Sequence, residues 1–274
     1  KGGDYGAHQP GYGPGGGIAY IGGSHGGLGG AYSTDGTRTP TYGVAAAPAM
    51  PGSGGGGSSA QYQTSGGAGG GVVRIEATGQ VVMNGTISAN GAADANVSGS
   101  SYVGGGGSGG SIWLTCATIT TTGGNIHANG GGAASQYNRS GGGGRIAIVT
   151  TDIETQRALL PLPLIIVAKR GIGNDLPRLG FPGTVHVSLQ QFLPDHITST
   201  YSGLYGGFGA WQSDSLTIDN TWIGALDSGV LINITNGLQV IGSAGRFDTT
   251  NAIINVGGDI TVKDSGVMHL FAGS

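Results

Sequence analysis

The sequence has little charge. Its 274 residues include 11 Lys and Arg against 14 Asp and Glu, which gives a net charge of −3 at pH 7. Charged residues make up 9% of the chain, where about 25% is usual. A nucleic-acid-binding protein needs a basic face to neutralise phosphates, and this chain has no basic run. We therefore expect no nucleic-acid partner.

Long apolar runs and cysteine are also scarce. The longest apolar run, from Leu159 to Ala168, is ten residues long and contains two prolines. A helix needs roughly 20 residues to span a bilayer, so we expect no membrane insertion. The single cysteine, Cys116, permits no internal disulfide, and its place in an alternating strand pattern predicts a buried apolar side chain. The sequence starts within a glycine tract, and we interpret it as part of a larger or processed polypeptide.

Glycine, in contrast, is abundant. It occupies 62 positions, of which 45 lie in residues 1–150, often in blocks such as 104–107 and 141–144. Glycine costs about 1 kcal/mol relative to alanine at a helical position, so long helices are not expected. Because glycine loses the most entropy on ordering, its abundance before each strand pattern predicts tight backbone packing. Flexible linkers are the alternative.

Two internal repeats predict the fold. In the first repeat, the strand patterns at residues 71–77 and 87–91 recur at 110–116 and 126–130. Each copy has two short alternating apolar strands, which is typical of strands with one buried face.

The C-terminal part has a second, shorter repeat. It makes Leu216, Leu238 and Ile260 equivalent, and it also relates Asn233 to Asn255. Short strands that recur in this way are typical of a solenoid whose coils stack at about 4.8 Å. We therefore predict an all-β fold, a right-handed parallel β-helix with ordered glycine-rich loops on its N-terminal side. The equivalent asparagines are expected to form an amide ladder at a corner of the coil.

The predicted regions are a glycine-rich β-helical module over residues 1–190, an aromatic-rich loop over 191–215, and a continuing β-helix over 216–274. Eight apolar side chains are expected to point inward and to stack between coils. They are Ile75, Ile87, Leu114, Ile126, Ile148, Ile218, Val240 and Val262.

Four glycine-rich segments carry a resemblance to a known type of module. They span residues 22–30, 51–57, 104–114 and 141–148. The sequence resembles the glycine-rich parallel β-helix modules of very large secreted and cell-surface proteins, which close with a Gly-Gly-Ala-Gly-Thr-Ile-Tyr-like strand. Residues 180–187 fill that place, with Phe181 and Pro182 replacing small residues. The resemblance implies a secreted, surface or filament setting and assigns no reaction.

No motif indicates catalysis or a bound cofactor. The Gly-Ser-Gly fragments belong to the repeats and lack the strand–helix context of a nucleophile elbow. The six histidines have no metal-ligand spacing, and the glycine-rich calcium nonapeptide is absent. We expect no catalytic residue, no metal site and no cofactor, with a single calcium ion near Asp4, Asp35 or Asp94 as the alternative.

Residues 195–227 combine aromatic and acidic side chains. Aromatic faces stack on sugar rings, and paired carboxylates hydrolyse glycosides, so a polysaccharide is the ligand to consider. The candidate sugar-binding residues are Tyr201, Tyr205, Trp211, Trp222, Asp214 and Asp219. The alternative is that the aromatic rings pack onto the flank of the fold. The segment 159–178, with Lys169, Arg170, Asp175 and Arg178, is interpreted as a solvated loop.

Four sequons place candidate glycosylation sites at Asn84, Asn96, Asn138 and Asn233.

From the whole sequence we predict an extracellular or cell-surface structural or adhesive component, such as a stalk or filament subunit, without catalysis. Its partners would be further copies or further domains of the same polypeptide. The alternative is a β-helix protein that binds or degrades a polysaccharide, as a hydrolase or lyase. Two carboxylates about 5–10 Å apart in a groove near Trp211 would favour an enzyme, and a sealed flank would favour the structural role.

Overall fold

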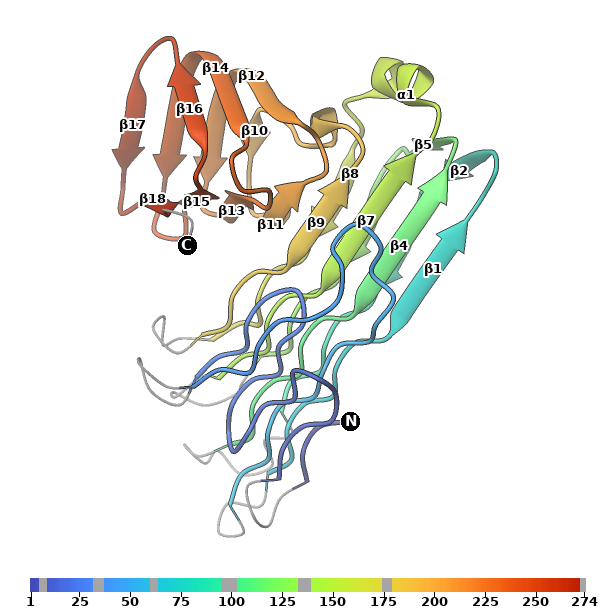
Figure 1. Cartoon of the computed structure of the whole chain (residues 1–274), viewed down its shortest axis with the longest axis vertical. Helices are drawn as coiled ribbons and strands as arrows, with labels where there is room; N and C mark the ends of the chain where they lie inside the picture. Colours follow the sequence, from blue (N-terminus) through green and yellow to red (C-terminus); the bar gives the residue numbers. More distant parts are fainter. Residues whose placement is uncertain are drawn as a thin grey trace.

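The structure is a computed structural model, which describes residues 1–4, 9–31, 37–59, 64–94, 103–132, 139–173 and 179–271. It has two parts (Figure 1). Strands fill the upper part, and a body of extended segments without strands lies below them. Among the described residues the only α-helix is α1 (Ile153–Leu159).

Eight parallel strands form the main path of the largest sheet, in the order β1-β4-β7-β9-β11-β13-β15-β18. Their bounds are β1 (Val72–Glu76), β4 (Ser111–Cys116), β7 (Arg145–Thr150), β9 (Thr184–Val187), β11 (Tyr201–Gly206), β13 (Trp222–Ala225), β15 (Arg246–Thr250) and β18 (Val267–Phe271). A branch of three strands joins this path at β11, namely β3 (Thr86–Ser88), β6 (Gly124–His127) and β8 (Leu164–Val167).

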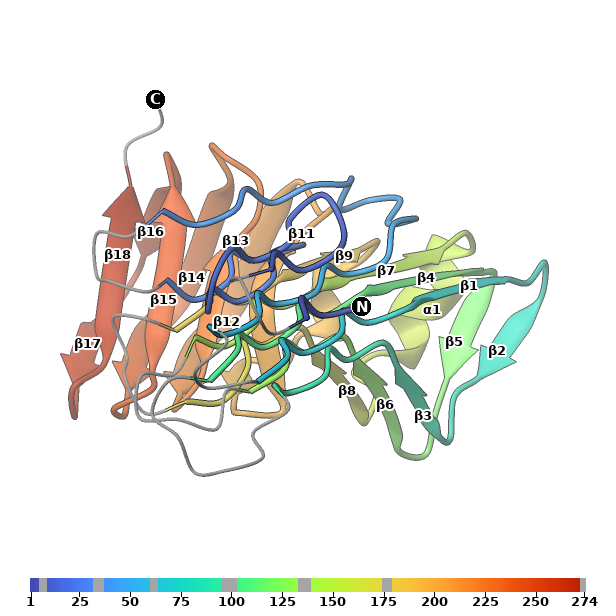
Figure 2. The ribbon, with the colours of Figure 1, turned by 90° about the horizontal axis from the view of Figure 1, so that it is seen from below.

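A second parallel sheet has five strands. It contains β10 (His196–Ile197), β12 (Ala210–Asp219), β14 (Leu231–Ile241), β16 (Ile253–Val256) and β17 (Ile260–Lys263). A small sheet pairs β2 (Gln80–Val82) with β5 (Thr118–Thr120), and the 3-10 helix η2 (Gln190–Phe192) precedes β10. Figure 2 shows β14 to β18 at one end of the molecule and β1, β2 and β3 at the other.

The fold class predicted from the sequence, a right-handed parallel β-helix with glycine-rich loops, is contradicted. The main path is a barrel-like sheet of eight parallel strands whose terminal strands, β1 and β18, each have one unpaired side among the described residues, and not one face of a solenoid of uniform coils. At β11 the branch merges with the path, because Tyr201 and Ser202 pair with β8 whereas Leu204 to Gly206 pair with β9. Repeat spacing predicts which residues are neighbours, but it does not predict how a sheet curves or branches.

The strand register, however, agrees with both repeats. Val72 lies opposite Ser111, its equivalent in the next copy of the first repeat, and Leu238 lies opposite Ile260, its equivalent in the second repeat. The amide ladder is also confirmed, since Asn255 Nδ2 donates to Asn233 Oδ1 at 2.9 Å. It lies within β14 and β16 and not at a corner.

Most of the predicted core is correct. Five of the eight side chains are fully buried: Leu114, Ile126, Ile148, Ile218 and Val240. Ile75 and Ile87 are partly buried against the same core, and Cys116 is buried as predicted. Val262 was predicted wrongly, because 46% of it is exposed. It lies opposite Val240, and among the described residues no further strand pairs with β17 on its other side.

The predicted regions share one sheet. Strand β9 lies in the region 1–190, β11 in 191–215 and β13 in 216–274, and all three are on the main path. The segment 191–215, which we expected to be a loop, contains β10, β11 and the first residues of β12.

We call the strandless body, which is formed by the described parts of residues 1–71, 89–110, 128–144 and 168–183, the glycine-rich body. It is held together by backbone hydrogen bonds that repeat with a period of three along the chain. In segment 103–110, the N–H groups at 105 and 108 donate to carbonyls of segment 53–56, and those at 106 and 109 donate to segment 139–142. The N–H groups at 107 and 110 donate to segment 89–92. A period of three is that of a polyproline II helix, which has no internal hydrogen bonds. Each such segment therefore bonds to neighbours on three sides.

The carbonyl groups of the same segment point to three further neighbours. Gly67 N and Gly70 N donate to the carbonyls at 105 and 108, Gly23 N donates to the carbonyl at 106, and Gly131 N donates to the carbonyl at 107. The carbonyl of Gly109, three residues after that of Gly106, faces the same neighbour as Gly106 and bonds to His25 Nδ1 at 3.0 Å. Segment 103–110 is thus surrounded on six sides.

This packing explains why the blocks are glycine. A Cβ atom built on Gly141 would lie 1.9 Å from the carbonyl oxygen of Gly107, and one on Gly105 would lie 2.1 Å from that of Ile21. Blocks 104–107 and 141–144 are buried and bonded to other segments. The prediction of tight backbone packing is confirmed, and the linker alternative is wrong for these blocks.

Candidate functional site

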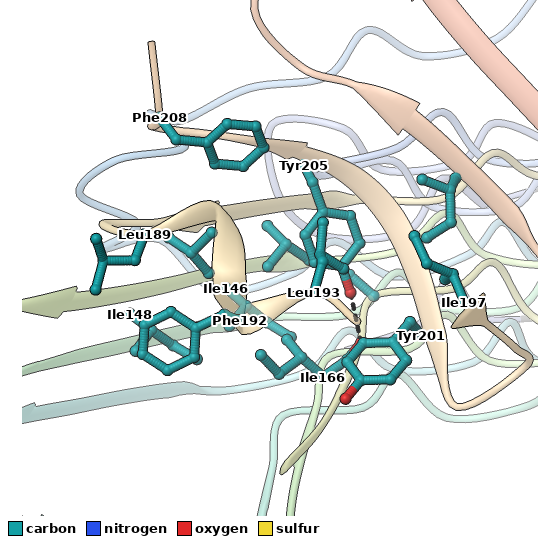
Figure 3. Close-up of a cluster of buried hydrophobic side chains, with 14 of the residues drawn as sticks. Ile146, Ile148, Ile166, Leu189, Phe192, Leu193, Ile197, Tyr201, Tyr205 and Phe208 are labelled. Atoms are coloured by element: carbon teal, nitrogen blue, oxygen red, sulfur yellow. Dashed lines mark hydrogen bonds between the residues drawn. The ribbon is translucent and has the colours of Figure 1, made fainter. Parts of the chain in front are cut away.

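Two of the predicted sugar-binding rings lie in the core. Tyr205 and Trp211 are each 1% exposed. The Tyr205 hydroxyl donates to the carbonyl of Ile166 at 2.7 Å, as Figure 3 shows, and burial raises the Tyr205 pKa well above its ordinary value. Trp211 packs edge-to-face on Phe208 and Phe247, with centroids 5.9 Å apart in each pair. We correct the prediction here, because neither ring offers a face to an external sugar.

The other predicted residues lie in separate places. Tyr201 is 8% exposed and belongs to the same core. Asp219 lies near His196, with 3.5 Å between Oδ2 and Nε2. Asp214 is exposed and lines a groove of about 590 Å³ together with Asp195.

That groove brings two carboxylates together without an aromatic platform. Its lining comes from the η2 region, β12 and β14, and includes Gln190, Gln212 and Asn233. Asp195 accepts a hydrogen bond from Ser213 Oγ at 2.6 Å. No aromatic side chain lines it among the described residues. The predicted combination of stacked ring and paired acids is therefore absent there.

A larger groove, of about 650 Å³, lies at Trp222. We call it the arginine groove, because Arg38, Arg170 and Arg246 line it together with Lys169. No Asp or Glu lines it among the described residues. The chain has only 11 Lys and Arg in total, so four in one groove is a strong local concentration of positive charge.

The indole of Trp222 organises the charges of the arginine groove. The Arg246 guanidinium lies 3.8 Å from the Trp222 ring centroid, and that of Arg170 lies 5.3 Å from it. Asp248 accepts from Trp222 Nε1 at 2.8 Å and from Arg246 Nε at 2.8 Å. Asp248 thereby fixes both the ring and Arg246. The face of Trp222 that would take a sugar ring is occupied by a guanidinium.

Arg170 and Arg38 are held in a partly desolvated setting. Burial, and then the nearby charge of Arg246, lower the pKa of Arg170 from its ordinary value. Burial likewise lowers the pKa of Arg38, whose Nε donates to the carbonyl of Gly29 at 3.1 Å and whose guanidinium lies 5.1 Å from the Phe181 ring. The sequence suggested that Arg170 belongs to a solvated loop. That prediction is wrong, because Arg170 is partly buried. Asp175 and Arg178 lie outside the described residues.

Sequence reasoning missed this groove, because its residues come from distant segments. Arg38, Arg170 and Arg246 are far apart along the chain. The available signal was the rarity of cations, which makes each buried one informative.

The remaining predicted sites have simple surroundings. Within the described ranges, no group of three or more His, Cys, Asp or Glu is placed to hold a metal ion. Asp4 pairs with Lys1 at 3.0 Å, Asp94 is buried, and Asp35 lies outside the described residues. Asn84 Oδ1 accepts from Thr122 N at 2.8 Å.

Of the other sequons, Asn233 takes part in the amide ladder. Asn96 and Asn138 lie outside the described residues, so their use for glycosylation stays a prediction.

Both ends of the main sheet path have an unpaired edge among the described residues. At one end β1 pairs only with β4, and at the other β18 pairs only with β15. Apolar side chains are exposed beside both edges, with Val82 62% exposed at the first end and Leu270 65% exposed at the second. We call these the β1 end and the β18 end.

No family model, curated protein or solved structure matches the chain. Across the described part of the chain, none of the helices has the length and apolar character needed to cross a membrane.

Proposed function

We propose that this chain is a non-catalytic structural module of an extracellular or cell-surface assembly, and that its copies associate end to end. The observation that carries the proposal is the pair of unpaired parallel edges at the β1 end and the β18 end. An unpaired edge presents N–H and C=O groups that accept a further strand.

The two ends are compatible in direction. Every pairing on the main path is parallel, so β1 and β18 run the same way and β18 of one copy can continue into β1 of the next. Both strands have five residues. Such contacts are head-to-tail and do not close on themselves, and they therefore generate a filament or stalk.

The exposed apolar side chains support the same contact. On the ladder that contains Val240, the inner residue is fully buried whereas Val262, next to the open side, is not. Ile260 and Leu270 are exposed at the same end. A second copy placed there would bury them as Val240 is buried, and apolar burial is worth about 25 cal/mol per Å².

The glycine-rich body suits a component that bears load and is not remodelled. Its segments bond on several sides through the backbone, and few charges are available to weaken the contacts. An extracellular location agrees with this construction and with the secreted modules that the sequence resembles, and it remains part of the proposal.

Analytical ultracentrifugation of residues 1–274 over a range of concentrations tests the assembly. We expect species that grow with concentration in the unmodified chain and a monomer in Val262→Lys, because the new charge would be buried at the contact. Val44→Lys is the matched control, since Val44 is 63% exposed and lies two residues after Tyr42, whose carbonyl accepts a hydrogen bond from Arg145 of the inner strand β7. A monomer at every concentration in the unmodified chain would overturn the proposal, as would equal effects of the two variants.

A further inference from the structure

We propose that the arginine groove is a binding site for an acidic polysaccharide, whose carboxylate or sulfate group bridges Arg170 and Arg246 beside Trp222. Val267, the first residue of β18, also lines this groove. Arg170, Arg246 and Trp222 lie before β18 in the chain and carry the proposal, which does not depend on end-to-end assembly.

The two guanidinium groups beside Trp222 differ in their counter-ions. Arg246 has a carboxylate partner, since its Nε lies 2.8 Å from Asp248 Oδ2. Arg170 has no carboxylate partner among the described residues, and its guanidinium lies over the ring of Trp222. Two guanidinium groups thus lie against one indole, and the single carboxylate there, that of Asp248, is paired with Arg246. A half-buried cation without a counter-ion is costly, and an anion from a ligand would remove that cost.

Arg246 and Arg38 are held in place without a ligand. The guanidinium of Arg246 is fixed from two directions, by stacking on Trp222 and by Asp248. The guanidinium of Arg38 is held by the carbonyl of Gly29 and by the ring of Phe181. Planar guanidinium groups bind carboxylate and sulfate oxygens in pairs of hydrogen bonds. Because these groups are already held in place, little side-chain entropy would be lost on binding.

The rest of the lining contains small polar side chains. Between the cations the groove presents small hydroxyl and amide groups, from Ser199, Asn220 and Ser243 among others. These groups suit the hydroxyls of a sugar. A nucleic acid would need a continuous basic track along its phosphates, and the chain carries a net charge of −3. A sugar unit bearing one anionic group fits this arrangement better than a polyphosphate chain.

The test is calorimetric titration of residues 1–274 with an oligogalacturonide, with its methyl-esterified form, and with a heparin-type sulfated oligosaccharide. We expect the acidic oligogalacturonide or the sulfated oligosaccharide to bind and the ester to bind far more weakly. Arg170→Gln should reduce the affinity by about tenfold or more, since it removes charge-assisted hydrogen bonds. Arg157→Gln is the matched control, because Arg157 is exposed on α1 and paired with Glu154 at 2.8 Å.

The outcomes separate clearly. Preference for the sulfated oligosaccharide, with the same loss in Arg170→Gln, supports the site and assigns sulfate as its anion. Equal binding of acid and ester, equal affinity of Arg170→Gln and Arg157→Gln, or no binding of any sugar overturns the proposal. Tighter binding of a single-stranded oligonucleotide through Arg170 overturns the assignment to a polysaccharide. Thermal unfolding of both variants, and of the more exposed Lys169→Gln, distinguishes lost binding from lost folding.

Discussion

The glycine-rich body and the strand-built part fill their interiors in opposite ways. In the strands, side chains such as Ile126 and Ile148 fill the core, and the backbone bonds within the sheets. In the glycine-rich body the backbone itself fills the interior, and segments such as 103–110 bond in several directions around their axis. The first arrangement derives stability from apolar burial, and the second from close contact of bare backbone. The difference teaches that a chain with few large side chains can still exclude water from an interior.

The largest expected loss of stability comes from a substitution in the glycine-rich body. Gly141→Ala would place a Cβ 1.9 Å from the carbonyl oxygen of Gly107. Because backbone on other segments would have to move, we expect a loss of about 4 kcal/mol or more, or failure to fold. Gly79→Ala is the control, since nothing lies within 4 Å of its Cβ, and it should change stability by less than about 1 kcal/mol. Urea unfolding measures both, and similar losses would contradict the packing described.

The second effect compares the inside of the strand-built part with its end. Val240→Asp places a charge at a fully buried position, and we expect a loss of about 3–5 kcal/mol. Val262→Asp changes the next residue of the same ladder, which is partly exposed, and it should cost less than about 1 kcal/mol. Thermal unfolding of monomeric samples gives the two values. Equal losses would mean that the β18 end is covered.

The third effect is a pH dependence that belongs to the glycine-rich body. Burial lowers the pKa of His25 to about 4, from 6.5, with Arg145 also lowering it. Between these values the unfolded chain binds a proton and the folded chain does not, so stability is full above pH 6.5 and falls as pH drops towards 4. The loss is about 3 kcal/mol at one pKa unit per 1.36 kcal/mol.

Chemical unfolding at a series of pH values measures this loss. His25→Asn keeps a donor for the Gly109 carbonyl and removes the titration, so its slope over the same pH interval should be smaller. An unchanged slope would show that other groups, such as His186, whose pKa burial also lowers, cause the dependence.

The smallest effect concerns the amide ladder on the strand-built part. Asn255→Ala removes a hydrogen bond to Asn233 at the surface, and we expect a loss of about 0.5 kcal/mol. A double-mutant cycle with Asn233→Ala should give a coupling energy of similar size. No coupling would mean that water replaces the ladder without cost.

The sequence predicted the register of the strands far better than their surroundings. The spacings of the two repeats paired Val72 with Ser111 and Leu238 with Ile260 correctly, because equivalent side chains recur along the chain. The same spacings could not predict the branched sheet, since the branch depends on how β11 changes partners along its length. They also could not reveal that Val262 lies next to an open end.

For the glycine-rich body, the sequence predicted that the glycine blocks are ordered, but it did not predict which segments pack against each other. Blocks of glycine carry no side-chain pattern that would specify which segments become neighbours. The groove at Trp222 was hidden for a related reason, since it brings Arg38 and Arg246 together from opposite ends of the chain. For Trp211 the sequence predicted a site that does not exist. The residue is close to several acidic residues in sequence, which suggested a sugar-binding ring, but its side chain lies inside the core.

The period of three in the glycine segments has a consequence for how such a sequence can change in length. A single insertion between Gly106 and Gly107 would rotate every later residue by a third of a turn. Ser108 would then take the place of Gly109, where a Cβ would lie 2.1 Å from the carbonyl oxygen of Ala128. A triple insertion would restore the phase. Insertions and deletions within these segments should therefore be tolerated in steps of three, much as a coding sequence tolerates them, although here the frame is set by which positions have room for a side chain.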